Sequence, residues 1–134
     1  FERALRILEA TLGPDHPNVA TDVNNLGLVL QDLGDLPAAR AAYERALRSD
    51  EATFGPDHPN VATDVNNLGS VLRAQGDLLT SRAAFERALR IFERALPPGH
   101  PNIAIARRGL EIVEQELASG QSLKTADKSW KQKG

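Results

Sequence analysis

Three histidines recur at one spacing, each followed by a proline, and they are the first residues to suggest metal binding or catalysis. They lie in Asp15-His16, Asp57-His58 and Gly99-His100, 42 residues apart. In a stack of equivalent units, neighbouring histidines would lie roughly 10 Å apart, since packed helix axes are 8–10 Å apart. Two zinc-ligating nitrogens must each lie about 2 Å from one ion. We therefore expect no shared metal site, and a helix-capping role for these residues.

No other pattern in the sequence predicts catalysis. The chain has no Cys, so it offers neither a thiolate metal site nor a cysteine nucleophile. Ser49, Ser70 and Ser81 lie in no strand-turn-helix elbow and beside no patterned His and acid. Phosphate-loop and dinucleotide-binding fingerprints are also missing. We expect no enzyme activity, no cofactor and no metal.

Two asparagine pairs offer a different chemistry, the binding of a polypeptide backbone. Asn24-Asn25 and Asn66-Asn67 each precede a Leu-Gly. A primary amide supplies two donors and an acceptor, so a file of such side chains can hold an extended peptide without reading its side chains. The alternative is that both pairs bond only locally or to water.

An internal repeat must position these residues. Residues 1–42 and 43–84 are identical at 31 of 42 positions, and a third, weaker copy begins at Phe85. The 134 residues therefore hold about three periods. Periods of 20–50 residues are typical of solenoids, in which each unit buries its apolar face against the next.

Each repeat predicts two helices. Between residues 18 and 33 the apolar residues recur at three- and four-residue intervals, which places them on one helical face. Gly34-Asp35 then supplies a stop and an N-cap, and Pro37 suits the first turn of the next helix. The Gly-Pro-Asp-His-Pro loop ends that helix. Along the chain this predicts six helices, at residues 1–12, 18–33, 36–53, 60–75, 78–96 and 102–118.

Gly27 and Gly69 lie in mid-helix, where Gly costs roughly 1 kcal/mol relative to Ala. We expect close approach of the following helix to offset this cost, through small and aromatic residues such as Tyr43. The third copy carries Glu111 at the corresponding position, and no second helix follows it. We expect the helix at 102–118 to cap the array with a polar outer face.

The spacing resembles the tetratricopeptide repeat. The residues that carry the resemblance are Val23, Leu26, Gly27, Leu30, Gly34, Ala39, Tyr43 and Ala46, and their counterparts from Val65 to Ala88. The 42-residue period and the long second helix are similar to the kinesin light chain type. The resemblance implies an all-α fold, a right-handed α-solenoid of antiparallel helix pairs.

The domain organisation expected from this resemblance is one array followed by a tail. The array covers residues 1–118, with a half repeat at 1–12, full repeats at about 18–53 and 60–96, and a capping helix at 102–118.

Residues 119–134 differ in composition from the array. All four lysines and the single Trp lie after Gly120, which gives these last residues a charge of +3 against −5 for residues 1–120. We expect a basic, flexible tail, with continuation as a short helix from about Ser122 as the alternative. One aromatic among lysines is a weak signal for an anionic surface.

The resemblance also implies where a partner binds, because the first helix of each pair lines a concave groove in this family. Asn25 and Asn67 lie at the positions where related superhelices carry a row of asparagines, the asparagine ladder. Gly109 takes the equivalent position in the third copy, so the ladder ends after two residues. Arg107 and Arg108 favour an acidic end of the ligand. The side chains expected to face the groove are Thr21, Asn24, Asn25, Leu28, Gln31 and Asp32, then Thr63, Asn66, Asn67, Ser70, Arg73 and Ala74, and finally Arg108.

We therefore expect a non-catalytic protein–protein interaction scaffold that binds an extended peptide or a partner helix in this groove. The carboxylate clamp of chaperone adaptors needs basic groove residues, and Arg73 is the only one at 18–33 and 60–75. The alternative is a structural module that stacks end to end, since the helix at 1–12 lacks its partner.

Composition predicts the setting of this scaffold. A net charge of −2 and short apolar stretches give no reason to expect a nucleic-acid or membrane partner. The absence of Cys is consistent with a cytoplasmic location, which we expect.

Overall fold

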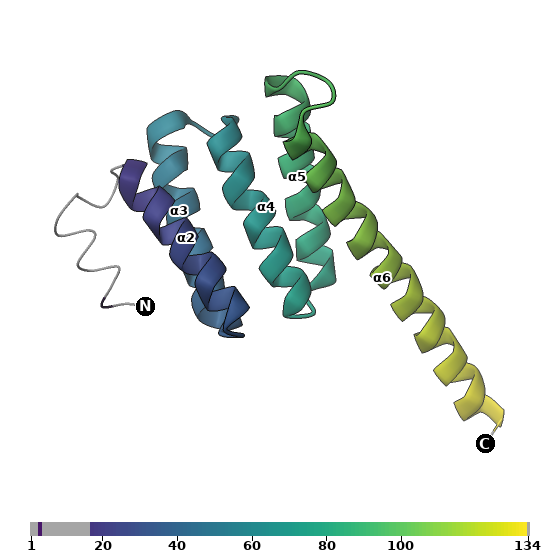
Figure 1. Cartoon of the computed structure of the whole chain (residues 1–134). Coiled ribbons are helices and arrows are strands. Elements are labelled where there is room, and N and C mark those ends of the chain that lie inside the picture. The colour runs from purple at the N-terminus through teal and green to yellow at the C-terminus, as the bar shows by residue number, and fades with distance from the viewer. Residues whose placement is uncertain (1–2, 4–16, 134) are drawn as a thin grey trace.

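The computed structural model describes Arg3 and residues 17–133, with the side chains of Arg3 and residues 19–120 (Figure 1). The helix expected at 1–12 lies outside the described residues. Within them the chain forms α-helices and no strand. The helices are α2 (Pro17–Asp32), α3 (Leu36–Phe54), α4 (Pro59–Ala74), α5 (Leu78–Ala95) and α6 (Pro101–Lys133).

Local signals set the helix boundaries. Gly34 and Gly76 adopt φ of 84° and 85°, which ends α2 and α4 where the sequence predicts. Asp35 caps α3, because its carboxylate accepts from the Ala38 backbone N–H at 3.3 Å. His58 caps α4 in the same way, accepting from the Asn60 backbone N–H through Nδ1 at 3.0 Å.

The capping role expected for the histidines is confirmed at two of the three. His100 Nδ1 accepts from the Asn102 backbone N–H at 3.1 Å, as His58 does one repeat earlier. The third, His16, lies outside the described residues.

Each helix packs against its neighbours in the chain, which makes the described part an all-α solenoid. α2 packs on α3, α3 on α4, α4 on α5 and α5 on α6, and α4 also touches α6. In Figure 1, α2 lies in front of α3, and α4, α5 and α6 follow from left to right. Three apolar clusters hold them together, one between α2 and α3, a second between α3 and α4, and a third among α4, α5 and α6.

The mid-helix glycines are close-approach sites, as expected. A Cβ added at Gly27 would lie 2.6 Å from Cε1 of Tyr43, and one added at Gly69 would lie 2.9 Å from Cε1 of Phe85. Both rings are buried. Only glycine leaves room for an aromatic ring here, and its contact with that ring offsets its poor helix propensity.

The third copy makes the same contact from a different position. Glu111, at the place of Gly69, is exposed, and Gly109 faces Phe85 instead, where an added Cβ would lie 2.5 Å from Cε1. The Phe85 ring is therefore enclosed by Gly69 of α4 and Gly109 of α6. The sequence predicts only that Gly109 ends the asparagine ladder, and this contact with Phe85 was not expected.

The expected end of the last helix at residue 118 is wrong, because α6 continues to Lys133. Gly120 does not end the helix, because it lacks the positive φ that four other described glycines adopt. No proline follows it either. Ile103, Ala106 and Val113 of α6 are buried and α6 packs on α5, as expected of a helix that caps the array.

The enclosed ring generates the first prediction. Gly109→Ala should lower the free energy of unfolding by about 1–3 kcal/mol, because the buried ring has no room to yield. Gly120→Ala is the matched control: an added Cβ there meets nothing within 4 Å, so stability should stay unchanged or rise by up to about 1 kcal/mol. Urea unfolding followed by circular dichroism measures both, and equal midpoints would contradict the role of the glycine.

Candidate functional site

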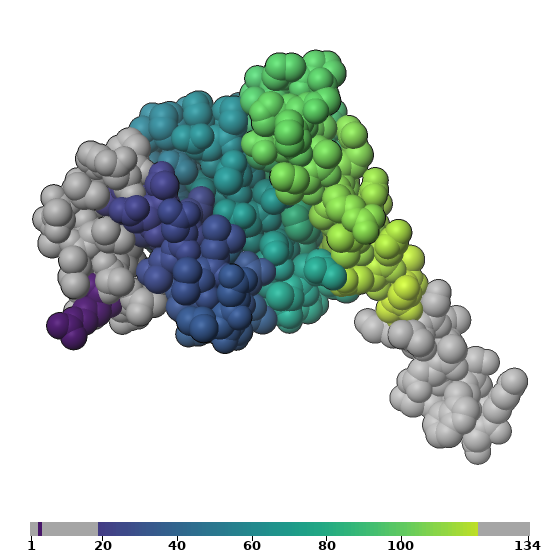
Figure 2. All heavy atoms as spheres, in the orientation of Figure 1, coloured from purple at the N-terminus to yellow at the C-terminus, as the bar shows by residue number. Residues whose placement is uncertain are grey.

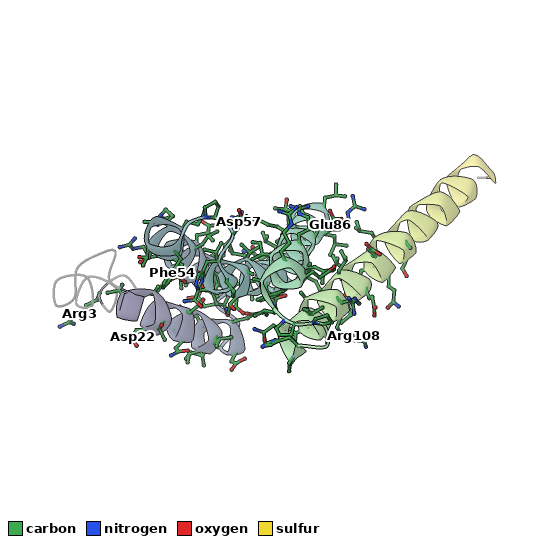
Figure 3. All side chains as sticks on the ribbon, turned by 90° about the horizontal axis from the view of Figure 1, so that it is seen from above. Arg3, Asp22, Phe54, Asp57, Glu86 and Arg108 are labelled. Carbon is green, nitrogen blue, oxygen red and sulfur yellow. The ribbon has the colours of Figure 1, made fainter. Side chains whose placement is uncertain are left out.

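Helices α2, α4 and α6 share one face of the molecule. Seen from above, Asp22 of α2 and Arg108 of α6 lie on one side, whereas Asp57 and Glu86 lie on the other (Figure 3). In the space-filling view, the surface over α4 lies between α2 and α6 (Figure 2). Two hollows follow this face, one between α2 and α4 and one between α4 and α6.

Polar side chains predicted to line a groove connect α2 to α4. Asn24 Nδ2 donates to Asp64 Oδ1 at 2.6 Å, and Asn67 Nδ2 donates to Asn24 Oδ1 at 3.3 Å. Nearer the other end of the helices, Gln31 Nε2 donates to Ser70 Oγ at 3.0 Å. These residues therefore join one repeat to the next as well as facing the shared surface.

Gln31 also contacts Tyr43, whose aromatic ring packs against Gly27. The Tyr43 hydroxyl donates to Gln31 Oε1 at 3.0 Å. Burial, followed by the nearby charge of Asp32, raises the pKa of Tyr43 to about 12. The hydroxyl consequently remains a donor over the whole physiological pH range.

The two predicted arginines differ in their availability. Arg73 is paired with Glu116 of α6, with its Nη2 2.6 Å from Oε1 of Glu116. Arg108 is exposed and lies 4.0 Å from Glu111. Arg108 is thus the more accessible of the two to an acidic ligand.

The other predicted groove residues fall into two groups. Thr21, Asn25, Leu28 and Thr63 are exposed, and the Thr63 hydroxyl donates to the Pro59 carbonyl at 3.2 Å. Asn66 is partly buried, and its Oδ1 has no hydrogen-bond partner among the described residues. Asp32 and Ala74 are exposed near the C-terminal ends of their helices.

A buried pair of acids at the α2–α4 hollow was missed by the sequence reasoning. Asp64 has an exposed fraction of 0% and Asp50 of 6%. Burial raises the pKa of Asp64 to about 9, with further contributions from a hydrogen bond to Asp50, the Asp50 charge and the Glu51 charge; the Asn24 bond opposes them. Asp64 therefore keeps its proton at neutral pH.

One signal for this pair was present in the sequence. Asp64 follows Val61 by three residues and precedes Leu68 by four, which places it on the apolar stripe that faces inward. Its counterpart one repeat earlier is Asp22, which is exposed. Because the sequence around Asp22 and Asp64 is the same, it does not indicate that only Asp64 is buried.

The acid pair opens into a hollow of about 260 Å³. Phe54, at the end of α3, stands at its edge and stacks on His58, with ring centroids 4.3 Å apart. The hollow is lined by Thr21, Asn24, Asn25, Asp50, Phe54, Asn60, Thr63 and Asp64.

Comparison with known families identifies this architecture. The tetratricopeptide repeat model matches residues 1–52, 21–78 and 63–122. The chain belongs to the tetratricopeptide repeat family. Such repeats generally mediate protein–protein interactions and are typically non-catalytic scaffolds.

Among solved structures, this tetratricopeptide repeat chain is similar to BtubC (BKLC) from P. vanneervenii, with a TM-score of 0.66 and 25% sequence identity. The match covers 95% of this chain and 55% of that one, so the chain spans about half the length of its structural relative. This relative is a kinesin light chain-like tetratricopeptide repeat protein, in agreement with the type that the 42-residue period resembles. A search of curated proteins finds no match.

In the described part of this repeat array, the His, Asp and Glu side chains nowhere gather in threes close enough to hold a metal ion. None of the helices in this part is both long and apolar enough to cross a membrane.

The buried acid generates a prediction about pH. The Asp64 pKa lies near 3.8 in an unfolded chain and near 9 in the fold. Between these values the folded state binds the extra proton, so stability falls as pH rises, by up to about tenfold in the folding constant per pH unit.

Unfolding midpoints measured from pH 5 to pH 8 test this dependence. Asp64→Asn, whose amide can donate where the protonated acid does, should flatten it. Asp22→Asn is the matched control, because Asp22 is the exposed counterpart, and should leave it intact. An unaltered pH slope in Asp64→Asn would contradict the assignment.

Proposed function

We propose that the chain is a non-catalytic scaffold that binds an extended segment of a partner protein along α2, α4 and α6. The observation that carries the proposal is the polar face of α2 and α4, on which amides of successive repeats meet, as Asn24 and Asn67 do at 3.3 Å. An extended backbone carries unpaired N–H and C=O groups, and primary amides can bond to both.

The same face offers apolar contacts beside the amides. Leu28 of α2 and Ile105 of α6 are 47% and 56% exposed. The hollow between α4 and α6, of about 180 Å³, places Ile105 and Phe92 beside Asn67 and Asn102. Apolar groups rimmed by polar ones are typical of protein-binding surfaces.

Charge favours an acidic residue of the ligand at the α6 end. Arg107 and Arg108 are both exposed there, and the described part of α2 contains no basic residue. Arg73 is less available because it pairs with Glu116. A carboxylate clamp of several arginines or lysines therefore does not fit this face, whereas a single acidic side chain near Arg108 does.

The amide face generates the third prediction. Peptides selected from a random display library against the protein should bind about tenfold more weakly to the Asn25→Ala/Asn67→Ala variant, because two hydrogen bonds are lost at roughly 0.5–1.5 kcal/mol each. Helicity and melting temperature should change little, since Asn25 is exposed and Asn67 makes one long bond. Fluorescence anisotropy measures the affinities.

Thr80→Ala is the control for this experiment, because Thr80 is exposed on α5, outside the proposed groove. Its affinity for the selected peptides should match that of the parent chain. Equal affinities in all three proteins would exclude the amide face as the binding site.

Self-association is a second candidate function, favoured by an apolar patch at the C-terminal end of α2 and the residue that follows it. Val29 and Leu33 lie one helical turn apart and are 54% and 76% exposed. We propose stacking of this patch between copies as the alternative, and light scattering over a concentration series distinguishes the two functions. A rising mass that Leu33→Gln abolishes supports stacking, whereas a constant monomer mass excludes it.

A further inference from the structure

The buried acids Asp50 and Asp64 stand where the next repeat has an apolar pair. Forty-two residues later the same positions are Phe92 and Ala106, both buried in the apolar cluster among α4, α5 and α6. Thr63 also lines the acidic hollow, and its equivalent in the next repeat is Ile105. The repeat architecture therefore forms this junction without any acid, and the fold alone does not explain the pair.

The pair also lacks a counter-charge. Asp64 Oδ1 accepts from Asn24, but Oδ2 is buried and finds no donor among the described residues. A buried carboxylate without a donor is costly, so Asp64 retains a proton and is hydrogen-bonded to Asp50. Both acids line the hollow, and none of the residues that line it with them is cationic.

We infer that this hollow is a subsite for a cationic side chain, lysine or arginine, of the segment bound along α2, α4 and α6. The inference rests on the proposed function and adds to it the chemistry of one ligand residue. The cation would bind in the hollow beside Asp50 and Asp64, and its charge would replace that of the proton that Asp64 now holds.

The remaining lining residues suit an organic cation. The amides of Asn24 and Asn60 supply oxygens that can accept from an ammonium or guanidinium group. Phe54, which is 38% exposed and stacked on His58, adds an aromatic ring to the lining, and aromatic rings attract such cations. The volume of about 260 Å³ far exceeds the roughly 30 Å³ of one water molecule.

A divalent metal fits this hollow less well. Calcium takes 6–8 oxygen ligands, usually several of them carboxylates. The hollow supplies Asp50 and Asp64, and no third His, Cys, Asp or Glu of the described residues joins them closely enough to hold a metal.

The subsite lies beside the amides of the proposed groove. Asn24 touches Asp64 on one side and Asn67 on the other, and Asn67 lines the second hollow with Phe92 and Ile105. A segment that bonds to these amides would place a basic side chain in the first hollow and an apolar one in the second.

Binding of the cation should be linked to proton release. The groups that act on Asp64 are Asp50 and Glu51 of α3 and the uncharged Asn24 of α2; Arg87 of α5 lies 3.7 Å from Glu51. With an Asp64 pKa of about 9, the site must lose a proton to the solvent before it carries both negative charges. Affinity should therefore rise with pH, by up to about tenfold per unit below that pKa.

The experiment uses methylguanidinium chloride as the probe, because the group keeps its charge up to pH 12. Side-chain amide and backbone signals of Asn24, Asn60 and Thr63 are followed by nuclear magnetic resonance during titration at pH 7 and pH 8.5. We expect saturable shifts in the millimolar range and tighter binding at the higher pH.

Two variants and one control assign the signal. Asp64→Asn should weaken binding at least about tenfold and remove its pH dependence, since the amide cannot ionise. Asp50→Phe/Asp64→Ala, which copies the next repeat, should abolish binding while circular dichroism shows the helices intact. Asp22→Asn, the exposed counterpart of Asp64, should bind as the parent chain does.

Peptides separate this inference from the proposed function. Among library peptides that bind the amide face, exchange of Lys or Arg for norleucine should cost at least about tenfold in the parent chain and little in Asp64→Asn. Groove binding by peptides that lack any cation would leave the proposed function standing and overturn the subsite. Absence of saturable methylguanidinium shifts at pH 8.5, or shifts produced by calcium chloride alone, would also overturn it.

Discussion

An aromatic ring held against glycine is the contact on which the packing of this chain depends. Tyr43 against Gly27, and Phe85 between Gly69 and Gly109, bring successive helices closer than any larger residue would permit. Since each helix packs mainly against its neighbours in the chain, these contacts set the spacing of the whole stack. They also determine how far apart α2, α4 and α6 lie on the shared face, and so which side chains can meet across it.

The polar face follows from that spacing. At the α2–α4 junction the side chains of Asn24, Asp64 and Asn67 are near enough to bond, and they connect the repeats where apolar packing does not. At the α4–α6 junction an apolar pair, Phe92 and Ala106, fills the equivalent place. One architecture therefore supports both a polar and an apolar junction, and this freedom allows a binding specificity to be built without altering the fold.

Much of the fold could be predicted from the sequence because its signals are local. Gly34 and Gly76 end helices, Asp35 and His58 start them, and apolar periodicity marks the buried faces. The end of α6 could not be predicted in this way, since Gly120 resembles a stop but lacks the positive φ and following proline that make one. The sequence also could not show that Gly109, and not Glu111 at the position equivalent to Gly69, contacts Phe85, because this depends on how α6 lies on α5.

The sequence by itself determined the repeat, its family, the helix pairs and the polar character of α2 and α4, because each rests on residue type and spacing along one chain. Only the tertiary structure decided which of those polar residues meet. Asp22 and Asp64 are equivalent in sequence, yet one is exposed and the other is fully buried with its pKa raised to about 9. The difference comes from the helices packed around each of them, and electrostatic free energy depends on that surrounding, which identical local sequences do not record.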